Sequence, residues 1–106
     1  MITPTYLYKI LSVTDWEESQ NDHRLKLSQM DSKFIHLATD QQVPHVIQKF
    51  WSSRSCVILK LKRSDLVGDL RYEKNPGGMS KYYHLYHGSI PFSAILEFKR
   101  YVKTFS

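Results

Sequence analysis

Segments that favour β-structure outnumber those that favour helix in this chain, and all of them are short. Two helices are predicted, one from about Asp15 to Asp22 and one from Pro44 to Trp51. No repeat or linker interrupts the 106 residues, so we expect a single domain spanning residues 1–106. The pattern predicts an α+β domain with more sheet than helix. The strands are expected at residues 5–13, 34–37, 56–62, 69–73 and 94–102.

A capping box is expected at the start of the first helix, and the same form recurs at Thr39, although Pro44 limits the turn there. Thr14 is followed three residues later by Glu17, and Thr39 is followed in the same way by Gln42. In this motif the threonine accepts from a backbone N–H, while the longer side chain reaches back. Trp16 is expected to anchor the first helix to the core. The second helix is expected to pack inward through its apolar residues, Val43, Val46, Ile47 and Phe50.

Composition restricts the class of protein. A hydrophobic fraction of 42% and an aromatic fraction of 13% indicate a globular core rather than disorder. No apolar run approaches the ~20 residues of a membrane helix, and Met1–Pro4 does not begin a signal peptide. Cys56, the single cysteine, lies in an apolar run and is predicted to be buried. The absence of a possible intrachain disulfide agrees with a reducing cytoplasm, which is the expected location.

The net charge of +5 is concentrated in the second half of the chain. Residues 1–53 carry a net charge of −1, and residues 54–106 carry +6. A basic half suits a phosphate-bearing partner such as a nucleotide or RNA. Chance asymmetry on an ordinary surface explains the same pattern equally well. There is no arginine-rich run, so a dedicated nucleic-acid-binding module is not indicated.

The run Phe34-Ile35-His36-Leu37-Ala38-Thr39 places an imidazole inside an apolar strand, just before a predicted helix start. Ligands often bind where a strand end leads into a helix start, because backbone N–H groups and side chains converge there. His36 is therefore a candidate functional residue, although a hydrogen-bonded core histidine also fits. Capping alone explains Thr39.

A second candidate cluster is Tyr82-Tyr83-His84-Leu85-Tyr86-His87-Gly88. In an extended segment His84 and Tyr86 share a face and could bracket a ligand, whereas His87 points away from His84. No metal site is expected, because no carboxylate or cysteine near these histidines has ligand-like spacing. Glu73 shares a strand face with Arg71, which fits either a surface ion pair or a carboxylate at the mouth of a cleft.

These motifs, taken in order, resemble a small bacterial family known as domain of unknown function 952. The chain departs from the family pattern at Lys33 in place of glycine, Ala38 in place of serine and Tyr83 in place of proline, with His87 inserted before Gly88. The Ala38 change removes a hydroxyl, so Thr39 would have to serve alone. The matching residues are Tyr8-Lys9-Ile10, Trp16, Asp31, Phe34–Thr39, Gln42, Tyr72-Glu73 and Tyr82–Tyr86.

That family resembles the ADP-ribosyltransferase fold, which RNA 2′-phosphotransferases use to act on RNA phosphate with NAD. The resemblance implies a split, twisted β-sheet domain with two short helices and a cleft for NAD or an ADP-ribose-type nucleotide. Glu73 would hold a ribose hydroxyl or steady a developing oxocarbenium charge. His36 and His84 would position phosphate or ribose, and one would act as acid or base. The further ligand-binding residues implied are Tyr8, Lys9, Thr39, Gln42, Arg71 and Tyr86.

Two functions therefore remain open. One is an NAD-dependent transferase or glycohydrolase-like enzyme that takes NAD as substrate, uses no metal and has RNA as a possible acceptor. The alternative is a non-catalytic module that binds a nucleotide or a small anionic metabolite. No membrane partner is expected in either case.

Overall fold

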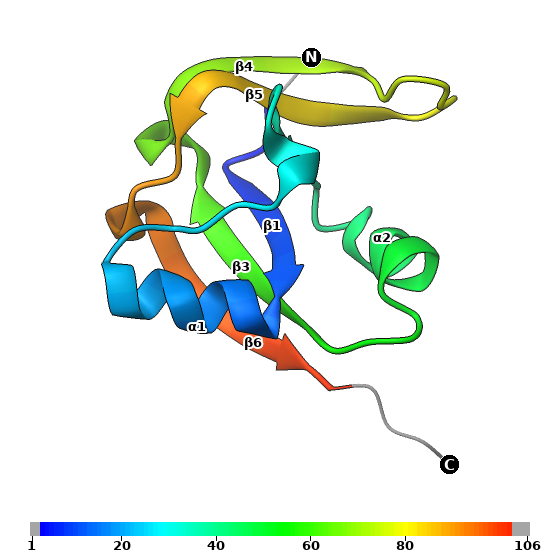
Figure 1. Cartoon of the computed structure of the whole chain (residues 1–106). Coiled ribbons are helices and arrows are strands. Elements are labelled where there is room, and N and C mark those ends of the chain that lie inside the picture. Colours follow the sequence, from blue (N-terminus) through cyan, green and yellow to red (C-terminus); the bar gives the residue numbers. More distant parts are fainter. Residues whose placement is uncertain (1–2, 103–106) are drawn as a thin grey trace.

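The computed structural model describes residues 3–102, in which two α-helices accompany two antiparallel three-stranded sheets (Figure 1). The helices are α1 (Val13–Asp22) and α2 (Val43–Phe50). One sheet has the order β1-β3-β6, with β1 at Tyr6–Ser12, β3 at Cys56–Lys62 and β6 at Ile95–Tyr101. The other has the order β2-β5-β4, with β2 at Ile35–Leu37, β5 at Lys81–Ser89 and β4 at Val67–Lys74. This arrangement confirms a small α+β domain with two helices.

All five predicted strands are present, and their ends lie within two residues of the predicted ends, with β3 matching at both ends. The additional strand is β5, whose mixture of tyrosines, histidines and lysine has no clear alternation of apolar and polar residues. Its conformation is fixed by pairing with β2 on one side and β4 on the other. The sequence did not predict this strand because its residues lack that alternation, and one of its two partners, β2, is remote along the chain.

The predicted capping box at Thr14 is wrong. Helix α1 begins at Val13, and its N-cap is Ser12, whose hydroxyl accepts a 3.0 Å hydrogen bond from the Asp15 N–H. The chain turns directly out of β1 at Ser12, so Thr14 already lies inside the first helical turn. At the second helix only half of the box forms. There the Gln42 side chain accepts from the Thr39 N–H at 3.0 Å, and the helix begins at Val43.

The core lies between the inner faces of the two sheets. Leu7 and Leu59 from the first sheet meet Leu37 and Leu85 from the second, and all four are almost completely buried. Trp16 closes one end of this core, as predicted, with its ring centroid 5.3 Å from that of Phe98. Among residues 3–102, the two sheets are joined by one bridge, in which Tyr8 and Ala38 exchange backbone hydrogen bonds of 2.8 and 2.9 Å.

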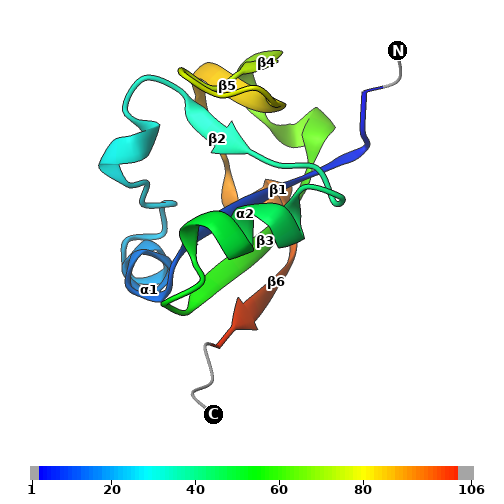
Figure 2. The same ribbon diagram turned by 90° about the vertical axis from the view of Figure 1, so that its right-hand side faces the viewer.

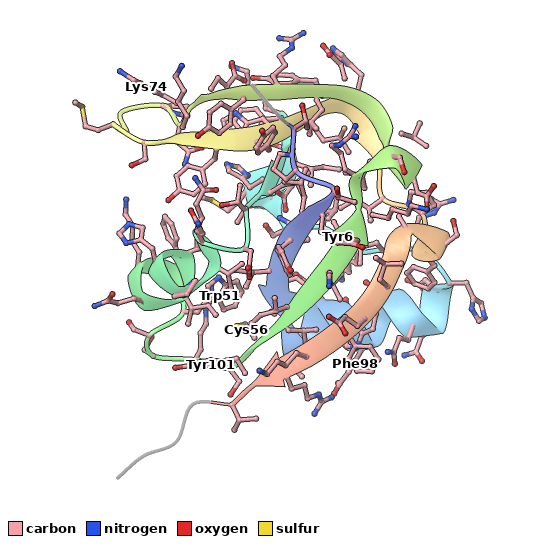
Figure 3. The ribbon with its side chains drawn as sticks, turned by 180° about the vertical axis from the view of Figure 1, so that it is seen from behind. Tyr6, Trp51, Cys56, Lys74, Phe98 and Tyr101 are labelled. Carbon is pink, nitrogen blue, oxygen red and sulfur yellow. The ribbon has the colours of Figure 1, made fainter. Side chains whose placement is uncertain are left out.

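The predicted inward packing of α2 is confirmed only in part, because Val43, Val46 and Ile47 are half-buried and Phe50 is not. No residue of α2 is fully buried, and Phe50 is 52% exposed. Figures 1 and 3 show α2 beside the β1 edge of the first sheet rather than across a sheet face. Figure 2 shows the same helix from the side, in front of β1 and β3. A sheet edge offers little apolar surface, so the apolar side of α2 stays only partly covered.

His87 is accommodated by a β-bulge between β4 and β5. The register shifts here, because Val67 pairs with Ser89 whereas Asp69 pairs with Tyr86. The backbone of His87 adopts the left-handed conformation at φ 50°, which residues other than glycine rarely adopt. The bulge turns the strand at His87 and leaves the regular register of residues 81–86 intact.

Candidate functional site

The register of the second sheet brings the two histidine motifs together. His36 pairs with His84, and His84 pairs with Arg71 on its other side. Directly paired residues of antiparallel strands share a face, so these three side chains lie on the face turned away from the core. Tyr82 paired with Glu73 and Tyr86 paired with Asp69 extend the same face. We call this surface the Glu73 face.

Glu73 is held by two neighbours on this face. Its Oε1 lies 3.1 Å from His84 Nδ1 and accepts a close hydrogen bond from the Tyr86 hydroxyl. The hydrogen bond from Tyr86 lowers the pKa of the Glu73 carboxyl most, and that from His84 lowers it further. The hydrogen bond between Tyr86 and Glu73 also raises the pKa of the Tyr86 hydroxyl. The Glu73 side chain is 38% exposed. It is therefore a fixed, ionised carboxylate that a ligand can reach.

His84 is the buried support of this carboxylate. Its side chain is 1% exposed, and its Nε2 lies 2.7 Å from Asn75 Oδ1 at the start of the loop between β4 and β5. With the Asn75 amide in this orientation both ring nitrogens face oxygen atoms, and turning the amide over would present its NH₂ group to Nε2 instead. The Phe34 ring stacks on the imidazole at 4.0 Å and excludes water from it. His84 thus serves to position Glu73.

His36 occupies a different setting, in which one ring nitrogen is left open. Its Nδ1 lies 3.0 Å from Asp31 Oδ1, and its backbone N–H donates to the same oxygen at 2.9 Å. The side chain is 35% exposed, and its Nε2 has no hydrogen-bond partner among residues 3–102. The 5.6 Å separation of the His36 and His84 ring centroids places the two imidazoles next to each other. Such a histidine can exchange a proton with a ligand through Nε2.

Asp31 and Lys9 form a buried ion pair beneath His36. Lys9 Nζ lies 3.0 Å from Asp31 Oδ1 and from Oδ2, and it donates to the His36 carbonyl oxygen at 3.1 Å. Burial alone would raise the pKa of Asp31, but the hydrogen bonds from His36 and the charge of Lys9 outweigh burial and lower this pKa to about 2. Burial lowers the pKa of Lys9, and Asp31 opposes that shift. Asp31 therefore stays ionised and fixes the orientation of His36.

Because folding lowers the pKa of Asp31, part of the free energy of unfolding depends on pH. The Asp31 pKa falls from an ordinary 3.8 to about 2 in the folded protein. The resulting stabilisation, about 2 kcal/mol, is complete above about pH 4 and is lost as the pH falls towards 2. We expect Asp31→Asn to remove this component, so that urea unfolding between pH 2 and 6 shows a shallower loss of stability than in the wild type. Parallel pH profiles for the two proteins would contradict this assignment.

The predicted ligand-binding residues divide into three groups. Arg71 and Tyr86 lie on the Glu73 face, where the Arg71 guanidinium sits 4.1 Å from the Tyr86 ring centroid and 2.9 Å from Asp69. Lys9 lies beneath the site, because both acceptors of its ammonium belong to the buried cluster. The other three residues, Tyr8, Thr39 and Gln42, line a separate open pocket.

Three residues that position the site had no assigned role in the sequence analysis. Asp31 appeared there only in the family pattern, Phe34 only in that pattern and in the apolar run around His36, and Asn75 did not appear. Apart from the family pattern, the signal for a role of Asp31 was that an acidic residue stands five positions before His36. The contacts of Asn75 and Phe34 with His84 depend on how the sheet brings distant segments together.

Two further properties of the described residues concern metal ions and membranes. Among residues 3–102, no group of three or more His, Cys, Asp or Glu side chains is placed to hold a metal ion. No helix in this part of the chain is long and apolar enough to cross a membrane.

The chain matches the model of a known protein family. The family model described as "Protein of unknown function (DUF952)" matches residues 10–98. The chain belongs to this family. The match spans all the residues of the Glu73 face, together with Asp31 and Asn75.

Solved structures show the same fold. The crystal structure of protein CC0527 from Caulobacter crescentus is similar with 28% sequence identity and a TM-score of 0.75, covering 91% of this chain and 85% of that chain. The solution NMR structure of CC0527 gives 26% identity and a TM-score of 0.70, with 91% and 84% covered. Comparison with curated proteins gives no match. The DUF952 fold is thus shared between this chain and a second protein.

Proposed function

We propose that this DUF952 protein binds NAD or an ADP-ribose-type nucleotide on the Glu73 face and catalyses transfer of ADP-ribose or phosphate. The observation that carries the proposal is Glu73 itself, a partly exposed carboxylate with a lowered pKa that Tyr86 and His84 hold in place. The single bridge between Tyr8 and Ala38 also supports a relationship to the split sheet of ADP-ribosyltransferase-like proteins.

In the proposed reaction Glu73 faces the ribose carbon that carries nicotinamide. The bond between this carbon and the nicotinamide nitrogen breaks, and its electron pair leaves with neutral nicotinamide. Positive charge develops on the ribose, and the Glu73 carboxylate stabilises it electrostatically. An acceptor hydroxyl, phosphate oxygen or water then forms the new bond to the same carbon.

His36 is suited to handle the proton of the acceptor. Its Nδ1 is oriented by Asp31, so Nε2 is the nitrogen available to a bound group. When a hydroxyl or water attacks the ribose, Nε2 accepts the proton that is released. In this scheme Asp31 is a positioning residue, because it acts only through His36.

Nicotinamide release tests the proposal. The full chain is incubated with NAD and with 2′-phosphorylated RNA, protein acceptors or water alone, and free nicotinamide is measured by chromatography. We expect Glu73→Gln to reduce release by about 100-fold or more, because the charge is lost while the shape is kept. Glu17→Gln, which makes the same change at an exposed carboxylate of α1 that is paired with Arg100, is the matched control and should retain wild-type release.

Two outcomes would count against this proposal. One is that the wild-type protein and Glu73→Gln release nicotinamide at the same rate as a protein-free blank with every acceptor. If NAD still raised the thermal stability of the wild-type chain, the non-catalytic binding module would then be the better description. The other is undiminished release by Glu73→Gln, which would place the chemistry elsewhere.

A further inference from the structure

An open pocket lies on the other side of β4 from the Glu73 face. Successive strand residues alternate between faces, so Tyr72 points to the side opposite to Glu73. Tyr72 lines an open pocket of about 740 Å³ together with Tyr6, Tyr8 and Lys60 from the first sheet and Thr39 and Asp40 from the segment before α2. This volume lies within the usual range for small-molecule sites. We call it the tyrosine pocket.

The aromatic walls of the tyrosine pocket are held in place by the fold. Tyr8 pairs with Lys60 across β1 and β3, so both side chains lie on the outer face of that sheet. In Figure 3, which views the molecule from behind, this outer face is turned toward the viewer and no helix lies over it. The Lys60 ammonium lies 4.4 Å from the Tyr6 ring centroid, and the Tyr72 ring lies 4.6 Å from the Tyr83 ring. Two aromatic rings are therefore already ordered for stacking.

Polar groups without protein partners converge on the same pocket. The hydroxyls of Tyr8 and Thr39 and the carboxylate of Asp40 make no hydrogen bond among residues 3–102. Gln42, which also lines the pocket, has both ends of its amide occupied, by the Thr39 N–H at 3.0 Å and the Lys81 carbonyl oxygen at 2.8 Å. Burial first and the nearby Asp40 second raise the pKa of Tyr8, which keeps its hydroxyl a hydrogen-bond donor.

These groups match the parts of a ribonucleoside. Tyrosine faces stack on planar bases. A carboxylate can accept hydrogen bonds from the two neighbouring hydroxyls of a ribose, as acidic residues do in dinucleotide-binding folds. Lys60 supplies a positive charge at the pocket wall for a 5′-phosphate. We propose that the tyrosine pocket binds the base and ribose of a ribonucleotide, with the base against tyrosine and the ribose diol on Asp40. This site requires neither Glu73 nor any cleavage of NAD.

Titration of the ¹⁵N-labelled chain tests the proposal with AMP, adenosine, 2′-deoxyadenosine and ribose 5-phosphate as probes. AMP and adenosine are expected to shift the amide signals of Tyr6, Tyr8, Asp40 and Tyr72 in a saturable way. 2′-Deoxyadenosine should bind about 10-fold more weakly or worse, because it leaves a hydrogen-bonding group of the site unpaired. Ribose 5-phosphate, which lacks a base, should cause no saturable shift.

One variant at each site separates the tyrosine pocket from the Glu73 face. Asp40→Asn should weaken adenosine binding about 10-fold and leave 2′-deoxyadenosine binding unchanged. Glu73→Gln should leave adenosine binding unchanged, whether or not the protein releases nicotinamide from NAD. Shifts that do not saturate, shifts confined to the Glu73 face, or equal binding by wild type and Asp40→Asn would overturn the proposal.

Discussion

Replacing Asp31 with alanine is expected to reduce the free energy of unfolding by about 3–5 kcal/mol at neutral pH. Lys9 and Asp31 are both buried, and their side chains are only 6% and 3% exposed. Removing the carboxylate leaves the Lys9 ammonium in the interior with one backbone acceptor, the His36 carbonyl oxygen. It also removes the acceptor of the His36 backbone N–H. Urea unfolding followed by circular dichroism measures this loss.

A double variant tests the physical reason for this loss. Lys9→Met combined with Asp31→Ala removes both charges, so no unpaired ion remains buried. We expect the double variant to regain a large part of the stability that Asp31→Ala loses, since apolar replacements of buried ion pairs are often close to neutral. Equal stability of the single and double variants would show that the charge of Lys9 is not responsible.

Replacing Gly88 with alanine is expected to destabilise the fold by about 3 kcal/mol or more. A Cβ atom at this position would lie 1.8 Å from the Val67 carbonyl oxygen and 2.8 Å from Gly68 Cα. Both obstacles are backbone atoms of the paired strand, so relief requires β4 and β5 to separate at the bulge. The predicted loss corresponds to a decrease in Tm of more than about 10 °C, measurable by calorimetry.

Gly77→Ala is the matched control for this prediction. Gly77 has a φ of 75°, and a Cβ atom built there meets no heavy atom within 4 Å. The expected cost is only that of the left-handed backbone conformation, about 1 kcal/mol. A Gly88→Ala protein as stable as Gly77→Ala would show that the bulge relaxes without breaking strand pairing.

Most of the secondary structure could be predicted because its signals are local. The alternation in Cys56–Lys62 and the apolar run before His36 reflect the faces of individual strands, and both segments form strands close to the predicted bounds. The predictions that failed concern how each element meets its neighbours. The start of α1 depends on where the chain leaves β1, and the exposure of α2 depends on its place beside a sheet edge.

The candidate site shows the same division. The sequence identified the types of residue that could carry chemistry, among them His36, Glu73, His84 and Tyr86. It also indicated that His84 and Tyr86 share a face, because strand alternation is a local property.

The tertiary structure decided which of these side chains meet and what each one does. Strand pairing set His36 beside His84, and the loop after β4 brought Asn75 against the same ring. It also buried Lys9 against Asp31 and assigned Tyr8 and Thr39 to a pocket on another face. The order of the amino acids determines the residue types and their local patterns. Contact, burial and pKa depend on neighbours that are remote in the chain, and only folding selects those neighbours.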